Sequence, residues 1–139
     1  MKSLNLLFVL TVVCAFAFPI ANANALEPKF TENPVEIKAA YQITEKNEGQ
    51  TYDDPTPAVL FAIPIFKVFV DTKGFIQNIE ILRTPSNPEA QFTVQMGLEA
   101  IKKSEPFENL NLENQGVVFN QTFLFRDDLK FKLRALDTK

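Results

Sequence analysis

Carboxylates are the clearest candidates for acid–base chemistry in this chain. Asp53-Asp54 and Asp127-Asp128 are two adjacent pairs, and two carboxylates can share the acid and base roles, as they do in glycosidases. Neighbouring side chains on an extended backbone point in opposite directions, so neither pair is expected to converge on one substrate. We interpret both pairs as solvated turn or loop residues.

Other catalytic and metal-binding groups are scarce. The sequence contains no His, and its one Cys is Cys14. A calcium loop needs oxygen ligands at a defined spacing, whereas Asp71-Thr72-Lys73-Gly74 places a lysine where a ligand should be. We therefore predict a protein that is not an enzyme, with no metal and no cofactor, although a carboxylate-only enzyme such as a glycosidase is formally possible.

Composition favours one small globular domain. The 139 residues are 46% hydrophobic and 22% charged, with 14 basic and 17 acidic residues and a net charge of −3. A protein that binds nucleic acid through general electrostatics needs a basic excess to displace counterions. The sequence therefore predicts no nucleic-acid partner.

Residues 1–25 have the pattern of a signal peptide. Lys2 precedes the apolar run Leu4–Phe18, which at about 15 residues is shorter than the ~20 needed to cross a bilayer. Small residues at Ala21, Ala23 and Ala25 predict cleavage after Ala25 or Ala23. Cleavage would leave a chain without a membrane anchor. An uncleaved signal anchor is the alternative.

Cysteine usage bears on the destination of the chain. Cys14 lies within the predicted signal peptide, so the processed protein would have no disulfide and would depend on core packing. Secreted eukaryotic domains of this size usually carry disulfides. We therefore expect a periplasmic or secreted bacterial protein.

The processed chain divides into an N-terminal arm and a domain. Residues 26–57 contain four prolines and a polar stretch, and we predict an arm that docks partly on the domain formed by residues 58–139. Within the arm, Val35 to Ile43 could be a short strand or a helical turn.

The strongest local pattern in the domain is a β-hairpin. Ile65–Val70 and Phe75–Leu82 are rich in β-branched and aromatic residues, and Asp71 and Gly74 between them are typical of a turn. Ile76, Ile79 and Ile81 would share one face if a β-bulge added one residue between Ile76 and Ile79.

A helix is predicted to follow the hairpin. Ser86 as N-cap and Glu89 three residues later form a capping-box pattern. The apolar face of the helix comprises Ala90, Val94, Gly97, Leu98 and Ile101. Phe92 and Met96 fall on nearly the opposite side, where either the N-terminal arm covers them or they are exposed for a partner; we favour the arm.

The C-terminal part is predicted to be extended. Apolar and polar residues alternate over Val117–Phe125 and again over Leu129–Leu133, which could be a final strand or an extension of the previous one. Together these patterns predict an α+β domain. It would contain a small antiparallel sheet of about three strands, possibly four, packed against one or two helices.

The order of these motifs resembles the C-terminal domain of TonB and TolA, the periplasmic ends of bacterial energy-transducing proteins. The matching residues are Val68-Phe69-Val70-Asp71-x-x-Gly74-x-Ile76-x-x-Ile79-x-Ile81, Asn87-Pro88-Glu89 at the start of the helix, Glu99-Ala100-Ile101 at its end, Ser104-x-Pro106-Phe107, and Val117 to Phe125. The resemblance implies the α+β fold and the binding of a peptide or protein through a sheet edge.

The candidate binding site is the last long strand, which would lie at an edge of a three-stranded sheet. An edge strand has free N–H and C=O groups that can accept an added strand. The candidate residues are Val117, Val118, Phe119, Asn120, Gln121, Thr122, Phe123, Leu124 and Phe125. The alternative is that this strand belongs to the core and that the arm or Leu129–Leu133 covers its edge.

The predicted partner is a protein or peptide, such as an outer-membrane or secreted protein. A homodimer through sheet pairing is also possible. Two other functions stay open: a short TonB-like energy transducer held by an uncleaved signal anchor, and a secreted domain whose phenylalanine-rich face binds an apolar small molecule.

Overall fold

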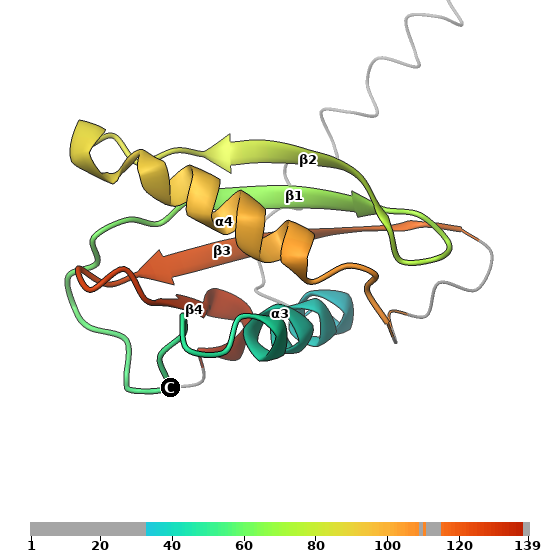
Figure 1. The fold of residues 1–139 in the computed structure, drawn as a ribbon, viewed down its shortest axis with the longest axis horizontal. Coiled ribbons are helices and arrows are strands. Elements are labelled where there is room, and N and C mark those ends of the chain that lie inside the picture. The colour runs from blue at the N-terminus through green and yellow to red at the C-terminus, as the bar shows by residue number, and fades with distance from the viewer. Residues whose placement is uncertain (1–32, 109, 111–114, 138–139) are drawn as a thin grey trace, which may run out of the picture. The chain divides into compact units, whose positions relative to one another are not determined.

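The chain forms an α+β domain in which two α-helices pack with an antiparallel sheet (Figure 1). The computed structural model describes residues 33–108, 110 and 115–137, which belong to one compact unit that begins at Glu32. The predicted signal peptide (1–25) and the first residues of the predicted arm lie outside the described residues. The described elements are α3 (Pro34–Lys46), β1 (Ile65–Val70), β2 (Ile76–Arg83), the 3-10 helix η1 (Pro88–Ala90), α4 (Phe92–Lys103), β3 (Val117–Phe125), β4 (Phe131–Leu133) and the 3-10 helix η2 (Arg134–Leu136).

The sheet has four antiparallel strands in the order β2-β1-β3-β4. The α+β prediction is thus confirmed, and the possible fourth strand is present as β4. β1 lies between β2 and β3. β3 is therefore a neighbour of β1 in space, although the whole of β2 and α4 lies between them in sequence.

The predicted hairpin is confirmed, including its turn. Asp71 Oδ1 accepts the N–H groups of Lys73 and Phe75, each at 2.9 Å. Gly74 has a φ of 87°, which is favourable for glycine because no Cβ meets the backbone. Asp71 therefore organises the turn, and Gly74 closes it.

The predicted bulge is also confirmed. Val70 pairs with Ile76 and Phe69 with Asn78, so Gln77 is the extra residue. A second register shift leaves Leu82 without a partner on β1. The first bulge places all three isoleucines opposite the buried side of β1, since Ile76, Ile79 and Ile81 pair with Val70, Val68 and Phe66.

The helix starts later than predicted. Asn87, not Ser86, is the capping residue, because its side chain accepts the Glu89 N–H at 3.1 Å and opens the short helix η1. The α-helix α4 then runs from Phe92 to Lys103. Its predicted inner face is confirmed, with Ala90, Gly97 and Ile101 buried and Val94 and Leu98 partly buried against the core.

Gly97 allows α4 to lie close to the sheet. A Cβ at this position would be 2.5 Å from Cε2 of Phe66, and Phe66 is itself fully buried. We expect Gly97→Ala to lower the free energy of unfolding by about 1–3 kcal/mol, because overpacking outweighs the helix propensity gained.

Urea denaturation measures this effect, with Gln95→Ala on the exposed side of α4 as the matched control. The control is expected to stay within about 0.5 kcal/mol of the wild type. Unchanged or higher stability of Gly97→Ala would show that the Phe66 ring can move aside.

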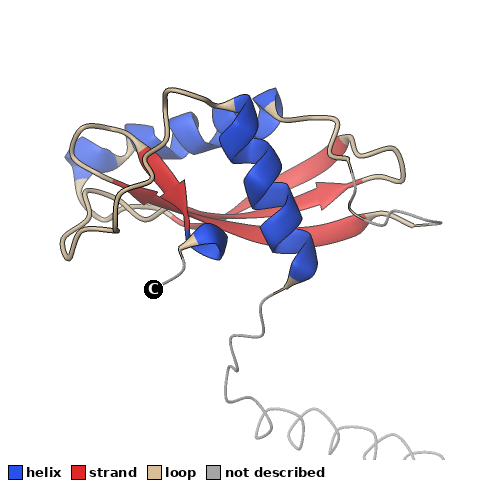
Figure 2. Cartoon of the chain, turned by 90° about the horizontal axis from the view of Figure 1, so that it is seen from below, coloured by secondary structure: helices blue, strands red, loops and turns tan. Residues whose placement is uncertain are grey.

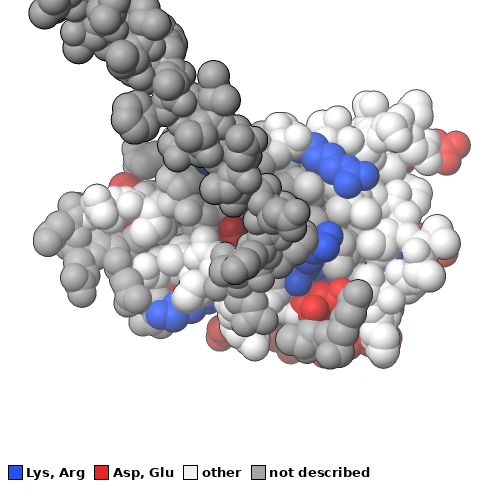
Figure 3. Space-filling model, turned by 180° about the vertical axis from the view of Figure 1, so that it is seen from behind, with Lys and Arg blue, Asp and Glu red and all other residues white. Residues whose placement is uncertain are grey.

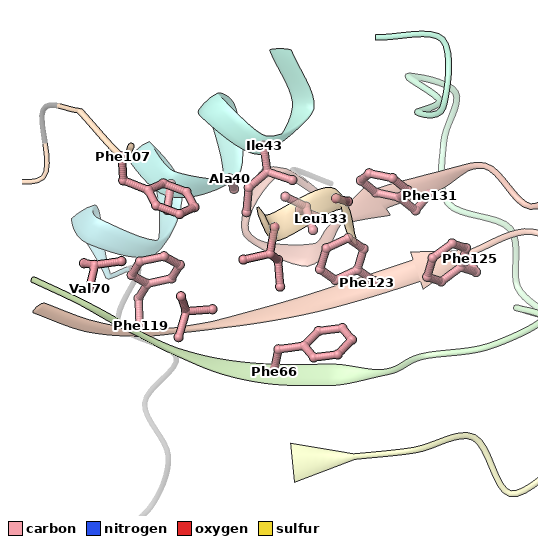
Figure 4. Packing of buried hydrophobic residues seen from close by; sticks show 14 of the residues in the cluster. Ala40, Ile43, Phe66, Val70, Phe107, Phe119, Phe123, Phe125, Phe131 and Leu133 are labelled. Carbon is pink, nitrogen blue, oxygen red and sulfur yellow. The ribbon is translucent and has the colours of Figure 1, made fainter. Parts of the chain in front are cut away.

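Phenylalanine rings fill the space between the sheet and the helices (Figure 4). The ring of Phe123 lies at centroid distances of 4.8 Å from Phe131, 5.4 Å from Phe66 and 5.9 Å from Phe125. All four side chains are at most 1% exposed. Aromatic packing at these distances adds specific ring contacts to the hydrophobic effect.

The segment predicted as an arm contains a core helix. Residues Pro34–Lys46 form α3, whose Asn33 cap accepts the Val35 N–H at 3.1 Å. Ala39, Ala40 and Ile43 are fully buried in the same core as the strands. The compact unit therefore begins at Glu32, and the structure does not separate the described part of the arm from residues 58–139.

Amide side chains also attach α3 to distant parts of the chain. Gln42 Nε2 donates to the carbonyl oxygens of Ser104 (2.6 Å) and Pro106 (2.7 Å), and Gln42 Oε1 accepts the Glu108 N–H at 2.9 Å. Asn47 Nδ2 donates to the carbonyl oxygen of Ala100 at 3.1 Å. Hydrogen bonds from α3 and from its C-cap Asn47 thus fix both the end of α4 and the segment after it.

Candidate functional site

The strand predicted as the binding edge lies inside the sheet. β3 pairs with β1 over Val117–Thr122 and with β4 over Phe123–Phe125. The prediction that it forms an edge is therefore wrong. Of the nine candidate residues, Phe119, Gln121, Phe123, Leu124 and Phe125 are buried, Val117 and Thr122 are half-buried, and Val118 and Asn120 are exposed.

The half of β3 that β4 does not reach is partly covered by α3. Glu36 accepts the Asn120 N–H through its carboxylate at 3.3 Å, and its carbonyl oxygen accepts Gln121 Nε2 at 2.9 Å. Figure 2 shows α3 passing in front of the strands on this side of the sheet. The alternative interpretation holds: β3 is a core strand whose edge is covered by the former arm and by the last strand.

The outer side of β4 is closed as well. Phe131 N–H donates to the Gln50 carbonyl oxygen at 3.0 Å, and its carbonyl oxygen accepts the Tyr52 N–H at 3.2 Å. Thr51 forms a parallel bridge with Phe131. Residues 50–52 thus act as a short protecting segment along β4.

β2 forms the remaining edge. Among the described residues, β1 is the only strand bonded to it. The first outward group of β2 is covered, because Glu105 Oε2 accepts the Ile76 N–H at 3.0 Å. Beyond this point, no described residue is hydrogen-bonded to the outer side of β2.

The backbone alternation identifies the groups that this edge offers. Phe123 N–H donates to the Pro64 carbonyl oxygen on the β1 side, so odd-numbered residues of β3 bond to β1 and their partners Phe66 and Val68 face β3. Lys67 and Phe69 then bond to β2 through Glu80 and Asn78. It follows that the N–H and C=O groups of Ile79 and Ile81 point outward.

Side chains along this edge are exposed. Ile81 is 46% and Leu82 is 50% exposed, although both are large apolar residues, and Glu80 and Arg83 are exposed too. We call the outer side of residues Ile79–Arg83 the β2 edge. It combines free main-chain groups with apolar and charged side chains.

The two aspartate pairs are arranged around one arginine. Arg126 binds Asp128 at 2.6 Å and Asp54 at 3.3 Å, so each pair contributes one carboxylate to a guanidinium. The hydrogen bond from Arg126 lowers the pKa of Asp128 below its usual value. Arg126 also lies 4.1 Å from the Tyr52 ring centroid. This arrangement connects the segment around Asp54 to the turn that contains Asp128.

A surface depression of about 620 Å³ lies beside this cluster. Its lining comprises Thr44, Thr51, Tyr52, Asp53, Pro55, Thr56, Pro57, Lys132, Leu136 and Asp137. Tyr52 is almost fully buried and donates to the Leu124 carbonyl oxygen at 3.0 Å, and burial raises the pKa of its phenol. The lining of this depression contains no phenylalanine. The rings of Phe66, Phe123, Phe125 and Phe131 pack against one another instead.

Phe92 and Met96 on α4 have different surroundings. Phe92 is 45% exposed, with its ring 6.2 Å from that of Phe61. Met96 is partly buried and lines a small depression together with Asn47 and Gln50. Residues of the segment predicted as the arm therefore lie beside Met96. The ring of Phe92 instead lies beside that of Phe61, which is outside that segment.

Three further observations concern metal sites, membrane-spanning helices and the distribution of basic side chains. Within the described ranges, no three His, Cys, Asp or Glu side chains are grouped as a metal site would require, and no described helix is long and apolar enough to cross a bilayer. On the face drawn in Figure 3, the visible basic side chains are separated from one another.

Comparison with protein-family models, curated proteins and solved structures finds no match to this chain. The resemblance to TonB and TolA therefore stays a prediction. The geometry of the β2 edge is the feature from which a function can be argued.

Proposed function

We propose that this chain is an exported, non-enzymatic domain that binds an extended segment of another protein along the β2 edge, as the resemblance to TonB and TolA domains would imply. The observation that carries this proposal is the open outer side of β2 next to exposed Ile81 and Leu82. An added strand would bond to the outward groups of Ile79 and Ile81.

The contrast with the other edges supports the proposal. Glu36 of α3 covers β3 at Asn120, residues 50–52 cover β4, and Glu105 covers the start of β2. Proteins usually protect sheet edges because an exposed edge can pair with another chain. The β2 edge is the longest open stretch of main chain that these contacts leave among the described strands, and we take it as the place for a partner.

Ile81→Pro tests this proposal. Proline lacks the outward N–H at this position, while the Glu80–Lys67 pairing with β1 remains. We expect at least about tenfold weaker binding of nine-residue synthetic peptides with alternating apolar and polar residues. Amide-shift titration of the isotope-labelled protein measures both the affinity and the residues that respond.

Ile81→Val is the matched control, since it keeps the N–H and a β-branched side chain, and it is expected to bind like the wild type. Circular dichroism verifies that both variants are folded. Peptide-induced shifts confined to Val117–Phe125, or full affinity in the folded proline variant, would contradict the proposal.

A further inference from the structure

The β2 edge has a defined order of charges on one face. Glu80 pairs with Lys67 and Arg83 with Ile65, and these β1 residues alternate with the buried Phe66 and Val68. Glu80 and Arg83 therefore lie on the sheet face turned away from α4. Ile79 and Ile81 lie on the opposite face, since they pair with Val68 and Phe66.

Neither charge is neutralised within the described part of the chain. The ion pairs there involve Arg126 and Lys132 with aspartates, and include neither Glu80 nor Arg83. Lys67 is the cross-strand neighbour of Glu80, yet its ammonium group lies 5.4 Å from the ring centroid of Phe69. The edge thus presents an exposed acid followed, toward its C-terminal end, by an exposed base.

From this order, and on the basis of the proposed function, we infer the charge pattern of the partner: an antiparallel segment in which an acidic residue precedes a basic residue by two positions. This is the spacing of Ile65 and Lys67 opposite Arg83 and Glu80 on β1, because Leu82 is the extra residue of a bulge and has no opposite position. The base lies opposite Glu80 and the acid opposite Arg83. Antiparallel pairing reverses the order, so the residue opposite Arg83 comes first in the partner.

A partner residue opposite Glu80 would lie close to it. Glu80 bonds to β1 through its own N–H and C=O, so its outward partner is a non-hydrogen-bonded pair, in which the two Cα atoms are only about 4.5 Å apart. Opposite charges at such a pair are favourable and like charges unfavourable. The partner residue between the acid and the base lies opposite Ile81, and the residue after the base lies opposite Ile79, which gives the order acid, apolar, base, apolar.

Two synthetic peptides of identical composition test this inference. One contains Glu-Val-Lys-Val at its centre and the other Lys-Val-Glu-Val, both flanked by the same threonines. We expect the acid-first peptide to bind the wild-type protein about fivefold more tightly at low salt. The preference should disappear at about 1 M NaCl, where surface charges are screened.

The double variant Glu80→Lys, Arg83→Glu is expected to invert the preference while the total affinity for the two peptides stays similar. Equal binding of both peptides to the wild type, with Ile81→Pro weakening both, would overturn the charge inference and leave the proposed function intact. A preference for the base-first peptide would overturn the antiparallel direction.

Failure of the proposed function has a different signature. Neither peptide would bind, or Ile81→Pro would have no effect on their affinity. Sedimentation of the protein without peptide is the last measurement: a dimer that Ile81→Pro abolishes would assign the β2 edge to a second copy and overturn the inference.

Discussion

Replacing Phe123 by alanine is expected to lower the free energy of unfolding by about 3–5 kcal/mol. The side chain is fully buried and contacts the rings of Phe66, Phe125 and Phe131. Its removal takes away both the transfer free energy of the ring and the contacts of three neighbours that cannot collapse together. Since small domains have a total stability of about 5–15 kcal/mol, the variant would be close to unfolding at ambient temperature.

Guanidinium denaturation followed by circular dichroism measures this loss. Phe75→Ala is the matched control, because the same atoms are removed from a side chain that is 45% exposed in the hairpin turn. The control is expected to lose less than half as much. A loss below about 1 kcal/mol at Phe123 would mean that the aromatic cluster is not the core of this domain.

Replacing Gly74 by alanine is expected to cost about 2–5 kcal/mol. Its φ of 87° is unfavourable for any residue with a Cβ, which accounts for about 1–2 kcal/mol. The new Cβ would also meet the backbone of Phe107, with the nitrogen at 2.9 Å and the carbonyl carbon at 3.0 Å. Backbone atoms cannot rotate away as a side chain can, and the Phe107 N–H is bonded to the Gly74 carbonyl oxygen at 2.8 Å.

Gly49→Ala separates the two contributions. Gly49 has the same φ of 87°, but an added Cβ would have no neighbour within 4 Å. The control therefore reports the cost of the backbone conformation alone, and the difference between the two variants reports the clash with Phe107. Equal losses would show that the segment around Phe107 can shift.

Local features of this fold can be predicted from sequence. The hairpin, its Asp71–Gly74 turn and the bulge at Gln77 all depend on residues between Ile65 and Arg83, and each is present. The predicted cap, Ser86, is one residue before the observed cap, because Ser86 and Asn87 can both cap and only the geometry of η1 selects Asn87.

Non-local features could not be predicted in this way. α3 has few large apolar residues, and its place in the core depends on Ala39 and Ala40 meeting strands far along the chain. Its polar residues Gln42 and Asn47 resemble a solvated loop in sequence, whereas their amides bond to backbone around α4. Periodicity carries no information about such partners.

The position of the open edge was, in contrast, within reach of the sequence. Only Arg126 to Lys130 separate β3 from β4, and strands joined by a short turn usually pair with each other. That rule predicts that β4 pairs with one side of β3. With β1 on the other side of β3, β2 is then an outer strand of the sheet. The residues missed by the prediction, Ile79, Ile81 and Leu82, follow from it directly.

The attachment of α3 has a consequence for the order of folding. Gln42 and Glu108 are 66 positions apart, and Glu36 and Gln121 are 85 apart. Synthesis on the ribosome releases α3 first, but the groups that hold it are made last. The hairpin forms by closing a short loop. The contacts of α3 require the closure of a much longer loop, which costs more conformational entropy. We therefore expect the beginning of the domain to be the last part to become native and the apolar side of α3 to be available to a chaperone during that interval.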